Sequence, residues 1–273
     1  MDVTLIPSQN QADFFCRRER CATYRHSAKT SGFISLRLPI ESSLTEPDSF
    51  SSMALWVEHG NVNGISFSAK NRDSRTAGEI RSAQFTARRG SQSSGFQQEL
   101  FWQSPNGETL LEEERTVRVA PGPCQGSIID LNILLRNSTV NSITLGKTLE
   151  SFVRLRVAPS LRPEGGGLIR NSFGDYAPHG LEGRSAKWCS AVGVVKGTTV
   201  GIVFLEHPRN PWNPSPWSLS PAGVLSPTPF PWREHTLKTK ETLTLSYRIM
   251  LHQGYVDAGW ATERLAEFAK YEN

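Results

Sequence analysis

Apolar side chains recur at every second position in several segments of this chain. The clearest example is the segment Thr242–His252. Its alternating apolar residues are Leu243, Leu245, Tyr247, Ile249 and Leu251. A period of two places such side chains on one face of an extended strand, where they can pack into a core. No segment up to Val157 keeps a helical period over three turns, so the pattern predicts an all-β fold with peripheral helices.

Turn residues divide the chain into a succession of such short segments. We expect strands at Phe14–His26, Phe33–Leu38, Met53–Val57, Ile65–Phe67, Glu79–Arg88, Gly95–Gln103, Thr109–Val119, Gly126–Asn137, Ser142–Thr144, Phe152–Val157, Ala191–Val195 and Thr198–Phe204. Asn106-Gly107 is typical of a tight hairpin turn, and a hairpin is also expected around Lys196-Gly197. The chain is long enough for one large all-β domain or two smaller ones, and we favour a single domain over residues 1–273.

One helix is expected at the end of the chain, over residues 257–271. Asp257 is a good N-cap residue, because its carboxylate can accept from the first free backbone N–H groups of a helix. Trp260, Leu265 and Phe268 form an apolar stripe at helical spacing. Such a stripe is typical of packing against a core and says nothing about chemistry.

The segment Gly201–Trp232 joins an expected buried strand to a loop rich in proline and tryptophan. Eight prolines lie between Pro208 and Pro231, and each fixes φ, so this long loop should be stiff. Long ordered loops are usually functional. Its candidate site residues are His207, Arg209, Trp212 and Trp217. Flat rings beside a cation and amides suit a sugar, although the same tryptophans could simply cap a hydrophobic core.

A glycine-rich segment precedes this strand, over residues 163–190. Its candidate site residues are Asn171, His179, Glu182, Lys187 and Trp188. Glycine lets the backbone approach a ligand or another strand closely. An antiparallel hairpin around Lys196-Gly197 would return the chain so that Lys187 and Trp188 meet His207 at one end of the sheet. We therefore expect the proline-rich loop to close over the glycine-rich segment.

A polar turn joins the segments Met53–Val57 and Ile65–Phe67. It carries His59, Asn61 and Asn63, which could form a polar cluster at a sheet edge and contact a substrate. The sequence Asn-Val-Asn-Gly is also ordinary turn chemistry, so both interpretations stay open.

Three functions are consistent with these residues. The first is a carbohydrate-active enzyme, a hydrolase, lyase or epimerase, with His207 or His179 as general acid or base and Glu182 or Glu58 as the carboxylate partner. Asn171, Lys187 and Arg209 would hold polar groups of the sugar, and Trp188, Trp212 or Trp217 would stack on its ring. The second is a carbohydrate-binding module without an acid–base pair.

The third function is a metal site built from His59, His179 and His207. These histidines lack close ligand spacing, so no metal or other cofactor is expected. The cysteines Cys16, Cys21, Cys124 and Cys189 contain no CxxC pair. We expect reduced thiols rather than a zinc site or a disulfide framework.

The charge and hydropathy of the chain exclude two classes of partner. A formal net charge of +4 and a pI near 9.0 are mild, and the basic residues are scattered, so nucleic acid is not an expected partner. No apolar run reaches the roughly 18 residues of a membrane span. The N-terminus lacks a basic start followed by an apolar block, so no secretory signal is visible. We therefore expect a soluble protein. Its location, cytoplasmic or periplasmic, and its oligomeric state are left open.

Five segments together follow a known family pattern. They are WVEHGNVNGISF (residues 56–67), GGLIRNSFG (166–174), EGRSAKWCS (182–190), IVFLEHPRNPWNPSPW (202–217) and PTPFPW (227–232). They resemble the DUF6807 family, which is often labelled methane oxygenase PmoA, from about Tyr24 to the closing helix. The HP-x-N-P-x-x-P-x-P-W portion is the most specific part. The resemblance implies a large antiparallel β-sandwich similar to the galactose-mutarotase superfamily. Members of that superfamily mostly bind or process carbohydrates, so the resemblance also implies a small carbohydrate as partner.

One stretch departs from the family pattern. The family usually has a histidine-rich stretch of the type Asp-His-Pro-His-His-Arg-Gly just before the polar turn. Here residues 48–54 read Asp-Ser-Phe-Ser-Ser-Met-Ala, without histidine or arginine. If that stretch supplies catalytic or metal-binding groups, this chain has lost them, which favours the binding module, or His59, His179 and His207 have replaced them.

Overall fold

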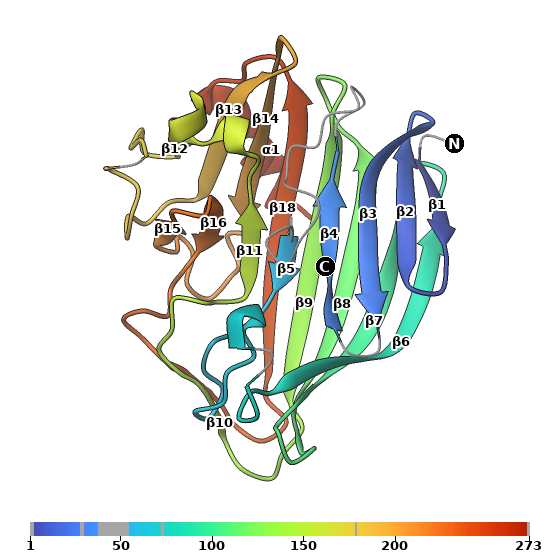
Figure 1. Cartoon of the computed structure of the whole chain (residues 1–273), viewed down its shortest axis with the longest axis vertical. Coiled ribbons are helices and arrows are strands. Elements are labelled where there is room, and N and C mark those ends of the chain that lie inside the picture. The colour runs from blue at the N-terminus through green and yellow to red at the C-terminus, as the bar shows by residue number, and fades with distance from the viewer. Residues whose placement is uncertain (1–2, 28–29, 38–54, 72–73, 178, 272–273) are drawn as a thin grey trace.

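Two eight-stranded antiparallel sheets face each other in a β-sandwich (Figure 1). The computed structural model describes residues 3–27, 30–37, 55–71, 74–177 and 179–271. The front sheet contains, in spatial order, β1 (Val3–Pro7), β2 (Gln11–Cys16), β3 (Glu19–Ser27), β4 (Thr30–Leu36), β5 (Leu55–Val57), β11 (Val153–Arg156), β16 (Val224–Pro227) and β15 (Trp217–Leu219).

The back sheet contains the longer strands. They are, in spatial order, β12 (Leu168–Asn171), β13 (Trp188–Val195), β14 (Thr198–Glu206), β18 (Thr242–Gln253), β9 (Ser127–Asn137), β8 (Thr109–Pro121), β7 (Ser94–Gln103) and β6 (Glu79–Arg89). A separate pair consists of β10 (Ile143–Leu145) and β17 (His235–Leu237), and the short 3₁₀ helices are η1 (Ala69–Asn71), η2 (Pro159–Leu161) and η3 (Pro163–Gly165). In Figure 1, β1–β4 lie in front of β6–β9.

The core lies between the two sheets, as the two-residue alternation predicts. In β18 the alternating residues Leu243, Leu245 and Ile249 are buried, and β18 pairs with β9 over ten residues. Phe14 of β2 meets Phe96 of β7 across the sandwich, with ring centroids 6.4 Å apart. The all-β class is therefore confirmed, with apolar faces of both sheets turned inward.

The outer face of the back sheet is covered by the helix α1 (Ala258–Phe268). The carboxylate of Asp257 accepts from the Trp260 N–H at 2.7 Å, so the predicted N-cap is present. Leu265 and Phe268 pack with Trp188 and Met250 in a cluster distinct from the core between the sheets. The predicted C-terminal helix therefore shields one half of this outer face.

Several predicted strand boundaries differ from the structure. Phe14–His26 is a hairpin rather than one strand, because Arg17 and Arg18 adopt positive φ and turn the chain between β2 and β3. Ile65–Phe67 makes only an isolated bridge from Ile65 to Val62. The sequence analysis also missed β1, β12, β15, β16 and β17. Residues 48–54, the stretch that departs from the family pattern, lie outside the described residues.

Strand β6 forms one edge of the back sheet. Its pairing with β7 shifts register between Ser82 and Gln84, which is a β-bulge. Strand β12 forms the other edge and is only four residues long.

Candidate functional site

The proline-rich loop lies directly against the glycine-rich segment. The Gly183 N–H donates to the Trp217 carbonyl at 2.8 Å, and the Trp217 N–H donates to the Arg184 carbonyl at 3.0 Å. The predicted register is confirmed, since Trp188 pairs with Leu205 and the Glu206 N–H donates to the Lys187 carbonyl at 3.1 Å. The two segments expected to form the site therefore meet.

Glu206 anchors the beginning of the proline-rich loop. Its carboxylate accepts from the Ser215 N–H at 2.9 Å, from the Ser215 hydroxyl at 2.6 Å and from the Asn213 amide at 3.2 Å. Burial raises the pKa of Glu206, although the hydrogen bonds from Ser215 and Asn213 oppose this effect. The buried carboxylate therefore holds the loop in place, because it accepts hydrogen bonds from residues seven and nine positions further along the chain.

Trp232 lies on the surface where the two segments meet. Its indole is 63% exposed and lies so close to Gly183 that a Cβ there would be 3.3 Å from the ring. Gly183 also has φ +72°, a conformation that favours glycine. Next to it, the Glu182 carboxylate accepts from the Leu219 N–H at 3.0 Å. We call this group, Glu182, Gly183, Leu219 and Trp232, the Trp232 surface.

Other predicted residues lie on the exposed side of the same segments. His179 and Lys187 are exposed in the glycine-rich segment, and Arg209 is exposed in the loop. Trp217 is fully buried instead. Its indole N–H donates to the Ala186 carbonyl at 2.8 Å. Trp217 therefore fastens the loop to the glycine-rich segment from inside the core.

Aromatic rings connect the polar turn to the loop. The ring of His59 stacks on Phe152 at 4.9 Å and meets Phe230 edge-on at 4.7 Å. Trp212 meets Phe230 at 4.8 Å and His235 at 5.4 Å. The predicted residues His59 and Trp212 are thus joined through Phe230, two residues before Trp232.

His59 itself is fully buried. Burial lowers its pKa to about 3, although the charge of Glu150 acts in the opposite direction. Neither ring nitrogen has a hydrogen-bond partner among the described residues. Its imidazole is therefore neutral. The Oδ1 of Asn61 holds the polar turn, because it accepts from the Gly64 N–H at 2.9 Å. The Oδ1 of Asn63 fastens the turn to β10, because it accepts from the Thr144 N–H at 2.7 Å.

Two ion pairs lie beside this turn. Of their four residues, only Glu58 was predicted from the sequence as a site residue. Glu58 pairs with Arg154 at 3.1 Å, and Lys70 pairs with Glu150 at 2.9 Å. Burial acts to raise the pKa of Glu150, but the hydrogen bond and charge of Lys70, together with Arg154, outweigh it and lower the pKa. Arg154 precedes the buried Leu155 on β11. An arginine among the apolar residues of a predicted strand is the sequence signal that could have identified this ion pair.

Three predicted residues have packing or turn-forming contacts. His207 lies beneath α1, where its ring meets Phe268 edge-on at 4.8 Å and its Nδ1 accepts from the Arg209 N–H at 3.1 Å. Trp188 belongs to the same helix-side cluster. Asn171 caps a turn, since its Oδ1 accepts from the Phe173 N–H at 2.9 Å. His207 and Trp188 thus face away from the core that contains Trp217.

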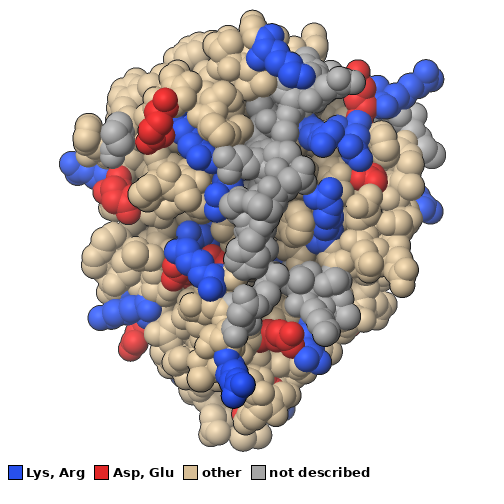
Figure 2. Space-filling view, in the orientation of Figure 1, with Lys and Arg blue, Asp and Glu red and all other residues tan. Residues whose placement is uncertain are grey.

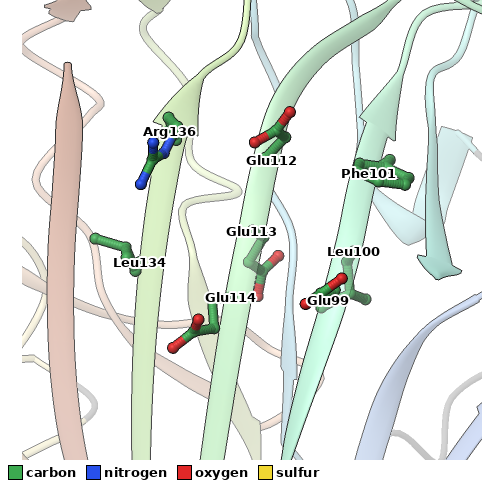
Figure 3. Close-up of a pocket in the computed structure, with 8 residues that line it drawn as sticks. All are labelled: Glu99, Leu100, Phe101, Glu112, Glu113, Glu114, Leu134 and Arg136. Carbon is green, nitrogen blue, oxygen red and sulfur yellow. The ribbon is translucent and has the colours of Figure 1, made fainter. Parts of the chain in front are cut away.

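Charges and surface hollows give further candidates. Lys and Arg side chains are spread over the face shown in Figure 2, with Asp and Glu among them. Figure 3 shows a pocket of about 170 Å³ on the back sheet, lined by Glu99, Glu112, Glu114 and Arg136 among others. A second cavity, of about 520 Å³, includes Asn63. Within the described ranges, no three His, Cys, Asp or Glu residues are grouped to hold a metal ion.

Comparisons with known proteins identify the family of this chain. The model of a family of unknown function, DUF6807, matches residues 48–266. The alpha-galactosidase from Lactobacillus brevis matches with 11% identity and a TM-score of 0.44, over 91% of this chain and 39% of its own. A polysaccharide lyase matches with 11% identity and a TM-score of 0.37, over 96% of this chain and 35% of its own.

The chain thus spans well under half the length of both solved structures. No curated protein matches its sequence. Among the described residues, no helix is long and apolar enough to cross a membrane.

Proposed function

The chain belongs to the DUF6807 family, and we propose that it binds a carbohydrate at the Trp232 surface. The observation that carries this proposal is the exposed side chain of Trp232 against the backbone of Gly183, the residue that follows Glu182. A sugar presents C–H faces, which stack on an indole, and O–H edges, which donate to a carboxylate.

The surroundings of Trp232 support binding because they are rigid. Gly183 and Trp217 are hydrogen-bonded to each other, and the Phe230 carbonyl accepts from the Thr148 N–H at 3.1 Å. The Glu182 carboxylate is oriented by Leu219 and uses one of its roughly four acceptor positions for that bond. A preorganised ring and carboxylate reduce the entropy lost when a sugar binds.

The buried histidines support binding more than acid–base catalysis. Burial and the charge of Arg209 lower the pKa of His207, and its side chain contacts Phe268 and the Arg209 backbone rather than a carboxylate. The pKa of His59 lies near 3 for the reason given above. An imidazole enclosed in this way is poorly placed to exchange protons with a sugar.

Binding of oligosaccharides to Trp232→Ala tests this proposal. A glycan array identifies the ligand, and calorimetry then compares the variant with wild type. We expect about tenfold weaker binding, which corresponds to about 1.4 kcal/mol, because the stacking ring is lost. Tyr255→Ala is the control, since Tyr255 is 62% exposed but contacts Arg170. Absence of any glycan ligand, or equal affinity of Trp232→Ala and wild type, would refute the proposal.

A carbohydrate-active enzyme is the second candidate. It is favoured by His179 and Glu182, which are both exposed and lie three residues apart in the segment that carries the Trp232 surface. In this case His179 would act as acid or base and Glu182 as its carboxylate partner in a hydrolase, lyase or epimerase. The bound sugar would be converted by wild type and remain unchanged with Glu182→Gln. Recovery of unchanged sugar after long incubation with wild type would contradict the enzyme and favour the binding module.

A further inference from the structure

Two cysteine side chains face each other in the hairpin of β2 and β3. The Sγ atoms of Cys16 and Cys21 are 2.8 Å apart, and both residues are 1% exposed. A formed disulfide bond is about 2.05 Å long, so the two thiols are already close to bonding distance. Both are free thiols in the structure.

The backbone of the hairpin produces this approach. Arg17 and Arg18 turn the chain with φ values of 51° and 72°, so that Cys16 pairs with Glu19. The register then shifts by one residue at Cys21, since Phe15 pairs with Arg20 and Phe14 pairs with Ala22. This bulge brings Cys21 to the buried face that also holds Cys16.

The charges at the hairpin distinguish the two sulfurs. The hydrogen bond from Cys21 lowers the pKa of Cys16, and the charge of Arg17 adds to this effect, while burial opposes it. The same hydrogen bond and burial raise the pKa of Cys21. Since the thiolate is the reactive form, the position of Cys16 next to Arg17 favours Cys16 as the attacking sulfur and Cys21 as the resolving one.

We propose that Cys16 and Cys21 form an intramolecular disulfide by exchange with a low-molecular-weight disulfide. The Cys16 thiolate attacks one sulfur of that disulfide, its S–S bond breaks, and one thiolate leaves. Cys21 then loses its proton and attacks the Cys16 sulfur of the mixed disulfide, which expels the second thiolate. The protein loses two hydrogens and two electrons, and the small disulfide is reduced to two thiols.

The place of the hairpin makes this proposal independent of the proposed function. The strands β2 and β3 lie near one end of the front sheet, and β15, which adjoins the Trp232 surface, forms the other end. The turn itself is exposed over residues 17–20, which gives a small disulfide access to the thiols when the turn opens. Oxidation should therefore lock the hairpin and leave sugar binding unchanged.

Peptide mapping of the native full chain tests the proposal. The native protein is incubated with oxidised glutathione, then unfolded in guanidinium chloride, alkylated with iodoacetamide and digested without reduction. We expect a peptide in which Cys16 and Cys21 are linked, lighter by the mass of two hydrogen atoms and lacking both alkyl groups. Reduction with dithiothreitol should restore alkylation of both cysteines.

Variants and an internal control make a negative result informative. Cys124 is exposed, so its glutathionylation reports that the oxidant has acted. Cys21→Ser should leave glutathione attached to Cys16, and Cys124→Ser should keep the crosslink. Arg17→Gln should slow crosslinking relative to Arg18→Gln. Full alkylation of Cys16 and Cys21 in wild type, under conditions that modify Cys124 completely, would overturn the proposal.

Discussion

Arg115 and Glu113 form an ion pair in the interior of the sandwich. The Nε of Arg115 lies 2.6 Å from Glu113, and both side chains are 2% exposed or less. The Trp102 indole N–H donates to the other oxygen of Glu113 at 2.8 Å, and Tyr24 donates to the amide oxygen of Gln98 nearby. Burial raises the pKa of Tyr24 to about 12, so its hydroxyl remains a donor.

Removal of one member of this pair should be costly. Arg115→Met leaves the Glu113 carboxylate buried without its cation, and we expect a loss of about 3–5 kcal/mol in the free energy of unfolding. Urea denaturation measures this loss. The matched control is Arg81→Met, because Arg81 pairs with Glu79 at 2.6 Å on the surface, where a loss within about 1 kcal/mol is expected. Equal losses in the two variants would contradict this view of the interior pair.

His59 should make the stability of the protein depend on pH. Its folded pKa of about 3 lies below its ordinary value of 6.5, so the unfolded state binds more protons between these values. The stabilisation is fully present above pH 6.5 and decreases as the pH falls toward 3. In His59→Phe, the loss of stability between pH 7 and pH 5 should be smaller than in wild type by about 2 kcal/mol. Equal losses of unfolding free energy in wild type and His59→Phe, measured by urea denaturation, would show that His59 can be protonated in the folded state.

At the scale of the element, Glu206 should determine the rigidity of the proline-rich loop. Glu206→Ala removes the carboxylate that accepts from Ser215 and Asn213, so three hydrogen bonds that hold the loop are lost. We expect faster amide hydrogen exchange in residues 207–219 than in wild type, and unchanged exchange in β8 and β9. Glu234→Ala, at an exposed position, is the control. Unchanged exchange in the loop would mean that its prolines alone hold it.

The long elements could be predicted from the sequence, whereas several of the short ones could not. Alternation over β18 and β9 identified both strands, because one face of each is buried along most of its length. The strands β15 and β17 have three residues each, which is too short for a period to be visible. Their positions are set by tertiary pairing, such as that of Trp217 with Pro227.

At the scale of the whole molecule, the sequence predicted the class of fold and which segments meet, but not which side chains face outward. The expected closure of the proline-rich loop over the glycine-rich segment is present, because a two-stranded hairpin fixes its register. His207 was expected in the site and lies under α1, since a position just past the end of β14 does not reveal which face the helix will cover. The roles predicted for the site residues stay predictions.

The single-domain organisation also stays a prediction, and calorimetry can check it. If residues 1–273 form one cooperative unit, heating should give one transition whose calorimetric and van't Hoff enthalpies agree. The shared core between the sheets favours this outcome, because Phe14, Phe96 and Leu225 belong to one apolar cluster. Two resolved transitions would contradict the single domain and indicate two cooperative units.

The edge strand β6 has a consequence for crowded solutions. An unpaired strand edge offers its free N–H and C=O groups to any other polypeptide, which is how fibres begin. Here the bulge after Ser82 interrupts that row, and Arg88 and Arg89 place like charges at the end of the strand. Two molecules that approached edge to edge would meet mismatched donors and mutual repulsion, so β6 protects the folded protein from polymerising through its back sheet.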